Sequence, residues 1–125
     1  MILLEDVLKL HDKSIDDFGG AKGIRDSGML ESALARPFQT SAGEDLYPAV
    51  FEKVAAIAES LIKNHAFIDG NKRTGILTMV SVLFEHNFAL TANEDELYNF
   101  TISISTSEIK FDDIVHWLKQ NSISL

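Results

Sequence analysis

The chain has 125 residues, 46% of them hydrophobic, which is enough to bury one core and too little for two ordinary domains. Its 11 Lys and Arg against 19 Asp and Glu give a formal net charge of -8, which argues against broad electrostatic binding to nucleic acid or to an anionic membrane. Cysteine is absent, which excludes disulfides and thiolate metal sites.

These limits indicate a single domain over residues 1–125 in which any anion site is local. No stretch approaches the ~18 apolar residues of a membrane span. Residues 1–4 lead directly into Glu5 and Asp6, without the basic start and long apolar run of a secretory signal. We therefore expect a cytoplasmic protein with no direct contact to nucleic acid or membrane.

The N-terminal part of the chain is predicted to form two helices. Apolar residues recur at helical spacing from Leu3 to Phe18, and two glycines end this first helix. Asp26 and Ser27 are plausible N-caps of a short second helix, which must stop near Pro37 because the residue before proline disfavours helical geometry. The following residues, 38–47, are predicted to be a loop.

The middle of the chain is predicted to contain two apolar helices separated by a sharp turn. From Pro48, which suits a first helical turn, an apolar stripe runs to Ile62. After the turn at Gly70, Asn71 can cap the next helix, which is apolar on nearly every face as far as Phe84. We predict that this helix, from Asn71 to Phe84, is the buried centre of the fold.

The C-terminal third is also predicted to be helical. Residues 95–106 fit two interpretations, because residues 101–105 alternate like a strand while the wider spacing of the large apolar residues suits a helix. We favour a helix. Ser107 can cap a final helix that packs Trp117 on the core. The predicted fold class is therefore all-α, a single compact helical bundle.

Residues 65–73, between the two central helices, carry the clearest functional signal. Free amides at a helix N-terminus, together with the positive end of the helix dipole, bind phosphate oxygens, and Gly70 lets the backbone approach closely. Lys72 and Arg73 oppose the dipole there and cost helix stability unless an anion lies between them. We predict that Gly70, Asn71, Lys72 and Arg73 hold a polyphosphate.

Four side chains of the same loop are predicted to be catalytic. His65 is the natural acceptor for the proton of an attacking hydroxyl, because histidine can take up a proton near neutral pH. Asp69 can hold a divalent cation, with magnesium preferring such oxygen ligands. Arg73 can donate two parallel hydrogen bonds to phosphate oxygens, and Lys72 can follow a moving phosphoryl group as a point charge.

Other residues are predicted to have structural roles. His11 and its acidic neighbour form half of a metal-dependent phosphohydrolase site, but the further ligands are missing, so we interpret them as part of a helix face. Arg25 and Asp26 are expected to form a local ion pair that supports a turn. Phe67 and Ile68 are expected to anchor the loop in the core.

The loop resembles the signature of the Fic/Doc superfamily, and specifically of its death-on-curing (Doc) toxin branch, on the residues His65-Ala66-Phe67-Ile68-Asp69-Gly70-Asn71-Lys72-Arg73-Thr74-Gly75. Similar residues in the first helix and over residues 19–37 extend the resemblance to most of the chain. It implies a Fic-like helical bundle with the catalytic loop between two helices. It also implies ATP as the phosphate donor, with Mg²⁺ held by Asp69.

Two positions depart from the AMP-transferring Fic enzymes. Those enzymes carry glycine where this chain has Lys72, and a second arginine where it has Ile76. The resemblance therefore implies phosphoryl transfer to a protein hydroxyl, as in Doc toxins that phosphorylate translation elongation factor Tu and stop protein synthesis.

Two alternatives remain open. The first is transfer of AMP or another nucleotidyl group, which labelled α-phosphate would distinguish from transfer of the γ-phosphate. The second is a catalytically weak module that binds an antitoxin and helps to regulate their shared operon. A His65→Ala variant as toxic as the parent would favour this binding role.

The resemblance further implies two protein partners. Residues 38–47 would be a flap that docks the target chain beside His65, by backbone pairing. The inhibitory motif of self-restrained Fic enzymes is absent, because its nearest counterpart, Ser27–Glu31, continues with Ser32. A separate antitoxin protein that folds onto a groove of the domain is therefore the expected inhibitor.

Overall fold

Six α-helices form most of residues 2–125, the part of the chain that this computed structural model describes. The helices are α1 (Leu4–Phe18), α2 (Ser27–Ala35), α3 (Val50–Lys63), α4 (Asn71–Glu85), α5 (Glu94–Ser105) and α6 (Phe111–Gln120). The short elements are η1 (Arg36–Phe38), β1 (Thr40–Ser41), β2 (Glu44–Asp45), β3 (Phe88–Leu90) and β4 (Ser122–Ser124). No helix within residues 2–125 is both long and apolar enough to cross a membrane.

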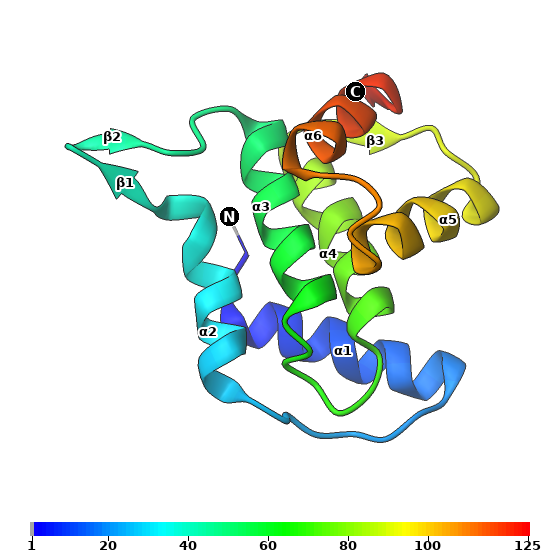
Figure 1. The fold of residues 1–125 in the computed structure, drawn as a ribbon. Coiled ribbons are helices and arrows are strands. Elements are labelled where there is room, and N and C mark those ends of the chain that lie inside the picture. The colour runs from blue at the N-terminus through cyan, green and yellow to red at the C-terminus, as the bar shows by residue number, and fades with distance from the viewer. Residues whose placement is uncertain (1) are drawn as a thin grey trace.

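The central pair of helices, α3 and α4, organises the domain (Figure 1). Helix α1 packs against α4, and α2 packs against α3 on the opposite side from α5. Helix α6 lies across α3, near the end of the bundle that is far from α1. The loop that carries the predicted site joins α3 to α4 at the end of the bundle closest to α1.

All six predicted helices are present, but several of their ends differ from prediction. Helix α3 begins after Ala49, whose backbone amide donates to the carboxylate of Glu52 at 3.3 Å, so Pro48 precedes the helix and does not lie in its first turn. Helix α2 ends at Ala35, and the chain passes Pro37 as one 3₁₀ turn. Proline removes a backbone donor but is compatible with the start of such a turn.

The structure of the C-terminal third decides between helix and strand for residues 95–106 and corrects the predicted start of the final helix. Residues 94–105 form a helix and not a strand, since Asn93 caps it by accepting from the backbone amide of Glu96 at 2.8 Å. The final helix does not start at the predicted cap Ser107, which has a left-handed φ of 59° and accepts a hydrogen bond from Lys63 Nζ at 2.6 Å. It begins after Lys110.

The all-α prediction missed two small antiparallel sheets. Strands β1 and β2 form a hairpin inside the segment predicted to be a loop, and β3 pairs with β4. Ala42 and Gly43 at the hairpin tip both have positive φ, 53° and 81°, as a two-residue turn that matches the strand twist requires. Strands of two or three residues are too short for a period-2 pattern to be visible in the sequence.

The most buried helix is α3, and the prediction that α4 occupies this place is wrong. Helix α4 leaves Val80 42% and Phe84 66% exposed. Eight residues of α3 are buried: Val54, Ala55, Ala56, Ile57, Ala58, Ser60, Leu61 and Ile62. Several small side chains among them let neighbouring helices approach α3 on many sides, whereas α4 has a solvent face despite its apolar sequence.

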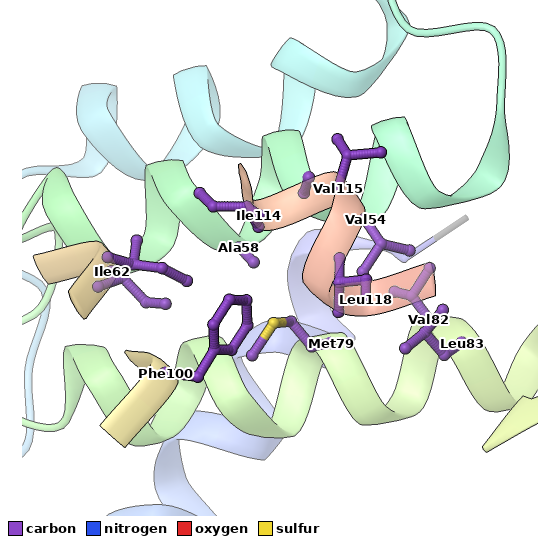
Figure 2. Packing of buried hydrophobic residues seen from close by; sticks show 12 residues of the cluster. Val54, Ala58, Ile62, Met79, Val82, Leu83, Phe100, Ile114, Val115 and Leu118 are labelled. Carbon is purple, nitrogen blue, oxygen red and sulfur yellow. The ribbon is translucent and has the colours of Figure 1, made fainter. Parts of the chain in front are cut away.

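The main core lies between α3, α4, α5 and α6 (Figure 2). Met79 of α4 and Phe100 of α5 lie next to each other, on the side of α4 that faces α3. Trp117 stacks on Phe100 with ring centroids 3.7 Å apart, which confirms that it packs on the core. A second cluster, formed by residues of α1, α2, α3 and the loop after α3, includes Val7, Leu30 and Phe67. The loop is therefore part of a hydrophobic core.

Gly75 allows the close contact between the first turns of α4 and the end of α3. A Cβ at this position would lie 2.5 Å from Cγ1 and 3.1 Å from Cδ1 of Ile62, a fully buried side chain. Such a contact requires the Ile62 side chain or one of the two helices to shift.

We predict that Gly75→Ala lowers the free energy of unfolding by about 1 to 3 kcal/mol, because overpacking outweighs the gain in helix propensity. Denaturant unfolding followed by circular dichroism measures this change. Val80→Ala, on the exposed face of the same helix, is the matched control and should change the free energy by less than about 1 kcal/mol. Equal stability of Gly75→Ala and the parent would contradict the close contact.

Candidate active site

The loop over residues 64–70 is held by the connection over residues 19–26. The carbonyl oxygen of Ala66 accepts hydrogen bonds from two successive amides of that connection, at 2.8 and 3.0 Å. Ile24 and Phe67 form an isolated antiparallel bridge. Two segments far apart in the sequence therefore support each other, below the ends of α3 and α4 (Figure 1).

His65 is exposed and lies in the left-handed region, with a φ of 51°. Arg25 stabilises this conformation, since its Nε donates to the carbonyl of His65 at 2.6 Å and its Nη2 to the carbonyl of Asn64 at 3.3 Å. The predicted ion pair between Arg25 and Asp26 is wrong within residues 2–125. Asp26 instead caps α2 by accepting from the amide of Met29 at 3.0 Å.

Asp69 is fixed through both its main chain and its side chain. Its carbonyl oxygen accepts from Nε2 of His11 at 2.8 Å, and its Oδ2 accepts from the amide of Ala21 at 3.0 Å. No group of three or more His, Asp or Glu side chains that could hold a metal occurs in residues 2–125. Magnesium usually binds one or two carboxylates together with phosphate oxygens and water. Asp69 therefore fits a cation that arrives with phosphate.

His11 positions this part of the loop, a role that the sequence prediction of a plain helix face missed. It is 2% exposed, and its ring stacks on Phe67 with centroids 3.8 Å apart and an interplanar angle of 7°. Because the carbonyl of Asp69 can only accept, Nε2 must carry the proton. Apolar Val7 and Ile15, four residues before and after His11, place it on the buried face of α1 and could have revealed this role.

Gly70, and not the predicted Asn71, is the N-cap of α4. Gly70 has φ 79° and ψ 18°, and a Cβ there would also lie 3.1 Å from Cδ1 of Ile15, so both conformation and space favour glycine. Asn71 is the first helical residue, and its side-chain amide exchanges two 3.0 Å hydrogen bonds with the backbone N and O of Phe67. This side chain clamps the loop through the main chain of Phe67.

A hollow of about 400 Å³ lies at the N-terminus of α4. All six predicted site residues line it: His65, Asp69, Gly70, Asn71, Lys72 and Arg73. Ile68, predicted to anchor the loop in the core, is 55% exposed and also lines the hollow, whereas Phe67 is buried as predicted. The loop therefore turns its polar side chains and one apolar residue toward the same space.

The hollow has unpaired donors on two sides. Within residues 2–125 neither Lys72 nor Arg73 forms an ion pair, and the guanidinium carbon of Arg73 lies 3.7 Å from the centroid of the exposed Phe18 ring. Ser14 of α1, which is 1% exposed, lines the hollow, and its Oγ has no hydrogen-bond partner among residues 2–125. A buried hydroxyl without a partner is costly, so an anion that accepts from it would stabilise the site.

The hairpin of β1 and β2 has a fixed base and exposed strands. Nε of Arg36, before the hairpin, donates to Oη of Tyr47, after it, at 3.1 Å, and Nη1 of Arg36 forms a 2.8 Å ion pair with Glu59 of α3. Burial alone lowers the pKa of Arg36. The hydrogen bonds and charge interactions with Tyr47 and Glu59 together raise it by more, so the pKa of Arg36 is above its ordinary value. The strands themselves are exposed, and in Figure 1 they project from the domain.

Comparisons with known proteins find similar sequences over the part of the chain that holds this loop. A model of the Fic/DOC family matches residues 2–83, a range that includes the whole loop. Toxin Doc from Mycolicibacterium smegmatis is 44% identical over 78 residues, which cover 62% of this chain and only 60% of that relative. Protein kinase doc from Escherichia phage P1 is 28% identical over 116 residues, covering 93% of this chain and 90% of the phage protein.

We predict that His11→Phe lowers the free energy of unfolding by about 1 to 3 kcal/mol, because it can keep the stack on Phe67 but leaves the Asp69 carbonyl without its donor. Denaturant unfolding of parent and variant measures this cost. Lys9→Gln, an exposed change on the same helix, is the control and should change stability by less than about 0.5 kcal/mol. Unchanged stability in His11→Phe would show that the hydrogen bond to Asp69 does not hold the loop.

Proposed function

The chain belongs to the Fic/DOC family, and from this membership we propose that it is a toxin that transfers a phosphoryl group from ATP to a hydroxyl of a protein. The observation that carries the proposal is the convergence of His65, Asp69, Lys72 and Arg73 on one hollow at a helix N-terminus. The name of the phage relative, Protein kinase doc, supports phosphoryl transfer over nucleotidyl transfer.

In the proposed reaction, the oxygen of the target hydroxyl forms a bond to the γ-phosphorus of ATP while the bond from that phosphorus to the β,γ-bridging oxygen breaks. The hydroxyl proton passes to the imidazole of His65, and ADP leaves. His65 suits this role because its exposed ring lies at the edge of the hollow, where a hydroxyl on a large protein can reach it. Arg25 keeps His65 in position by donating a hydrogen bond to the carbonyl oxygen of His65.

The other site residues would bind and orient the phosphates. Lys72 and Arg73 supply charge, the first amides of α4 supply donors, and Ser14 supplies a buried hydroxyl. Asp69 would hold Mg²⁺, which neutralises phosphate charge when bound. In such a reaction the protein contributes mainly position and charge. The rigid support of the loop by His11 and residues 19–26 suits that requirement.

We propose elongation factor Tu as the target, with the β1–β2 hairpin as the surface that receives it. The two exposed strands leave backbone groups on their outer edges, which can pair with an extended segment of another protein. The clamp of Arg36 on Glu59 would hold that edge in one position relative to His65.

We further propose that a cognate antitoxin inhibits the enzyme by covering an apolar surface. Val80 and Phe84 of α4 are exposed. They are next in sequence to Ser81 and Glu85, which line a hollow of about 380 Å³ between α1 and α4. An amphipathic segment of a partner could fold onto such a groove.

The decisive test is incubation of the purified chain with elongation factor Tu, magnesium and ATP, followed by mass spectrometry of the target. We expect a gain of about 80 Da, one phosphoryl group. His65→Ala should slow this modification at least ~100-fold because it removes the proton acceptor. His116→Ala, an exposed histidine on α6 far from the loop in sequence, is the matched control and should retain full activity.

Other results would change the assignment in defined ways. A gain of about 329 Da, with label transferred from the α-phosphate, would establish adenylyl transfer. A His65→Ala variant that modifies the target at the parent rate would refute the role of His65 as base. An unmodified target together with toxicity that does not need His65 would favour the binding module.

A further inference from the structure

Phe18, the last residue of α1, stacks against the guanidinium of Arg73. The guanidinium carbon is 3.7 Å from the centroid of the ring, whereas the three other contacts of this kind within residues 2–125 measure 5.4 to 5.6 Å. The ring and the guanidinium are therefore in van der Waals contact. Phe18 is 60% exposed and belongs to neither of the two hydrophobic clusters. Core packing therefore does not account for an aromatic side chain at this position.

Arg73 shares a hollow with carboxylates, yet it forms no ion pair with them. Glu94 and Asp95, in the first turn of α5, line a second hollow of about 380 Å³ that Arg73 and Phe18 also line. None of these three charged residues has an ion-pair partner within residues 2–125. Opposite charges that line one hollow attract each other. An additional interaction must therefore hold the guanidinium where it is.

The carboxylates next to Phe18 in the sequence have partners of their own. Asp16 lies 3.2 Å from Nζ of Lys22, and Asp17 lies 2.9 Å from Nζ of Lys13. These exposed pairs reduce the attraction of both carboxylates for a neighbouring cation. The competition for the guanidinium at the start of α4 therefore comes mainly from α5.

We propose that Phe18 is a positioning residue that keeps the guanidinium of Arg73 available for phosphate. Stacking uses only the flat face of the guanidinium, and its N–H donors lie in the plane, so they remain free to bind an anion. An ion pair with the carboxylates of α5 would occupy the same donors. This inference rests on the proposed function, in which Arg73 supplies charge to the phosphates.

The chemistry of the ring suits this role. The face of an aromatic ring attracts a cation because its π electrons make it negative, but the ring carries no net charge. The stacked pair of Phe18 and Arg73 therefore keeps its full positive charge in a chain whose net charge is -8. A carboxylate at position 18 would cancel that charge, and an aliphatic side chain would not attract the cation. We therefore expect tyrosine, but not leucine, to replace Phe18.

The first experiment tests the contact itself by NMR of the full chain with labelled arginine side chains. A proton that lies over the face of an aromatic ring gives an upfield-shifted signal, and we expect this shift for the Nε proton of Arg73. Phe18→Leu should remove the upfield shift, and Phe18→Tyr should retain it. The same Arg73 signal in the parent and in Phe18→Leu would overturn the proposal.

The second experiment measures the affinity for inorganic tripolyphosphate by calorimetry at low ionic strength. We expect Phe18→Leu to raise the Kd about fivefold, because the carboxylates of α5 then compete for Arg73. Phe18→Tyr should bind within about twofold of the parent. Phe84→Ala removes another exposed ring, outside both hollows, so this matched control should bind like the parent. Equal Kd values for the parent and Phe18→Leu would contradict the positioning role.

A double-mutant cycle tests whether α5 is the competitor. The paired change Glu94→Gln and Asp95→Asn removes both carboxylates. In Phe18→Leu this change should lower the Kd for tripolyphosphate by about fivefold more than it does in the parent, where stacking already holds Arg73 away from α5. A merely structural effect of Phe18 would give the same gain in both backgrounds, and that result would overturn the proposal.

The outcomes separate this inference from the proposed function. Equal binding of tripolyphosphate by the parent and Phe18→Leu, with γ-phosphoryl transfer intact, would refute the role of Phe18 and leave the kinase assignment standing. Coupling between Phe18 and the carboxylates of α5, together with transfer of the α-phosphate to the target, would support the role of Phe18 and refute phosphoryl transfer.

Discussion

The hydrogen bond from His11 to the carbonyl of Asp69 fixes the loop on which the candidate site depends. It joins α1 to the loop between α3 and α4, and the stack of His11 on Phe67 makes the same junction part of a hydrophobic core. A loop of seven residues has little structure of its own. Here buried contacts hold its main chain, so its polar side chains can lie in solvent without losing their relative positions.

The close packing of α3 against α4 explains how a charged site can be stable in so small a domain. Gly75 brings α3 and α4 together one turn beyond Lys72 and Arg73, so the helix end that carries these cations is anchored by close packing. The cations oppose the dipole of α4 and form no ion pair within residues 2–125. Stability from the core therefore offsets a local cost at the site, as expected where residues are placed for binding.

Sequence patterns predicted the helices and singled out the six residues that line the hollow at the N-terminus of α4, because helical periodicity and the first turn of α4 are local features. They did not predict the support of the loop. The partners of Arg25 and His11 lie 39 to 58 positions away in the chain. The residue type of Asn71 suits an N-cap, and only the structure shows that its side chain binds the main chain of Phe67 instead. The sequence also did not show that α3 is more buried than α4, because hydrophobicity alone does not show how many sides of a helix are covered.

The charges around the loop restrict where an anion can bind. The chain carries a net charge of -8, so an anion is attracted only where Lys72, Arg73 and the amides of α4 outweigh the surrounding carboxylates. Glu94 and Asp95 line a neighbouring hollow of about 380 Å³ beside Ile76, and they oppose that attraction on the side of α5. The cationic surface therefore ends at Arg73, and the proposed phosphate site is confined to the first turn of α4.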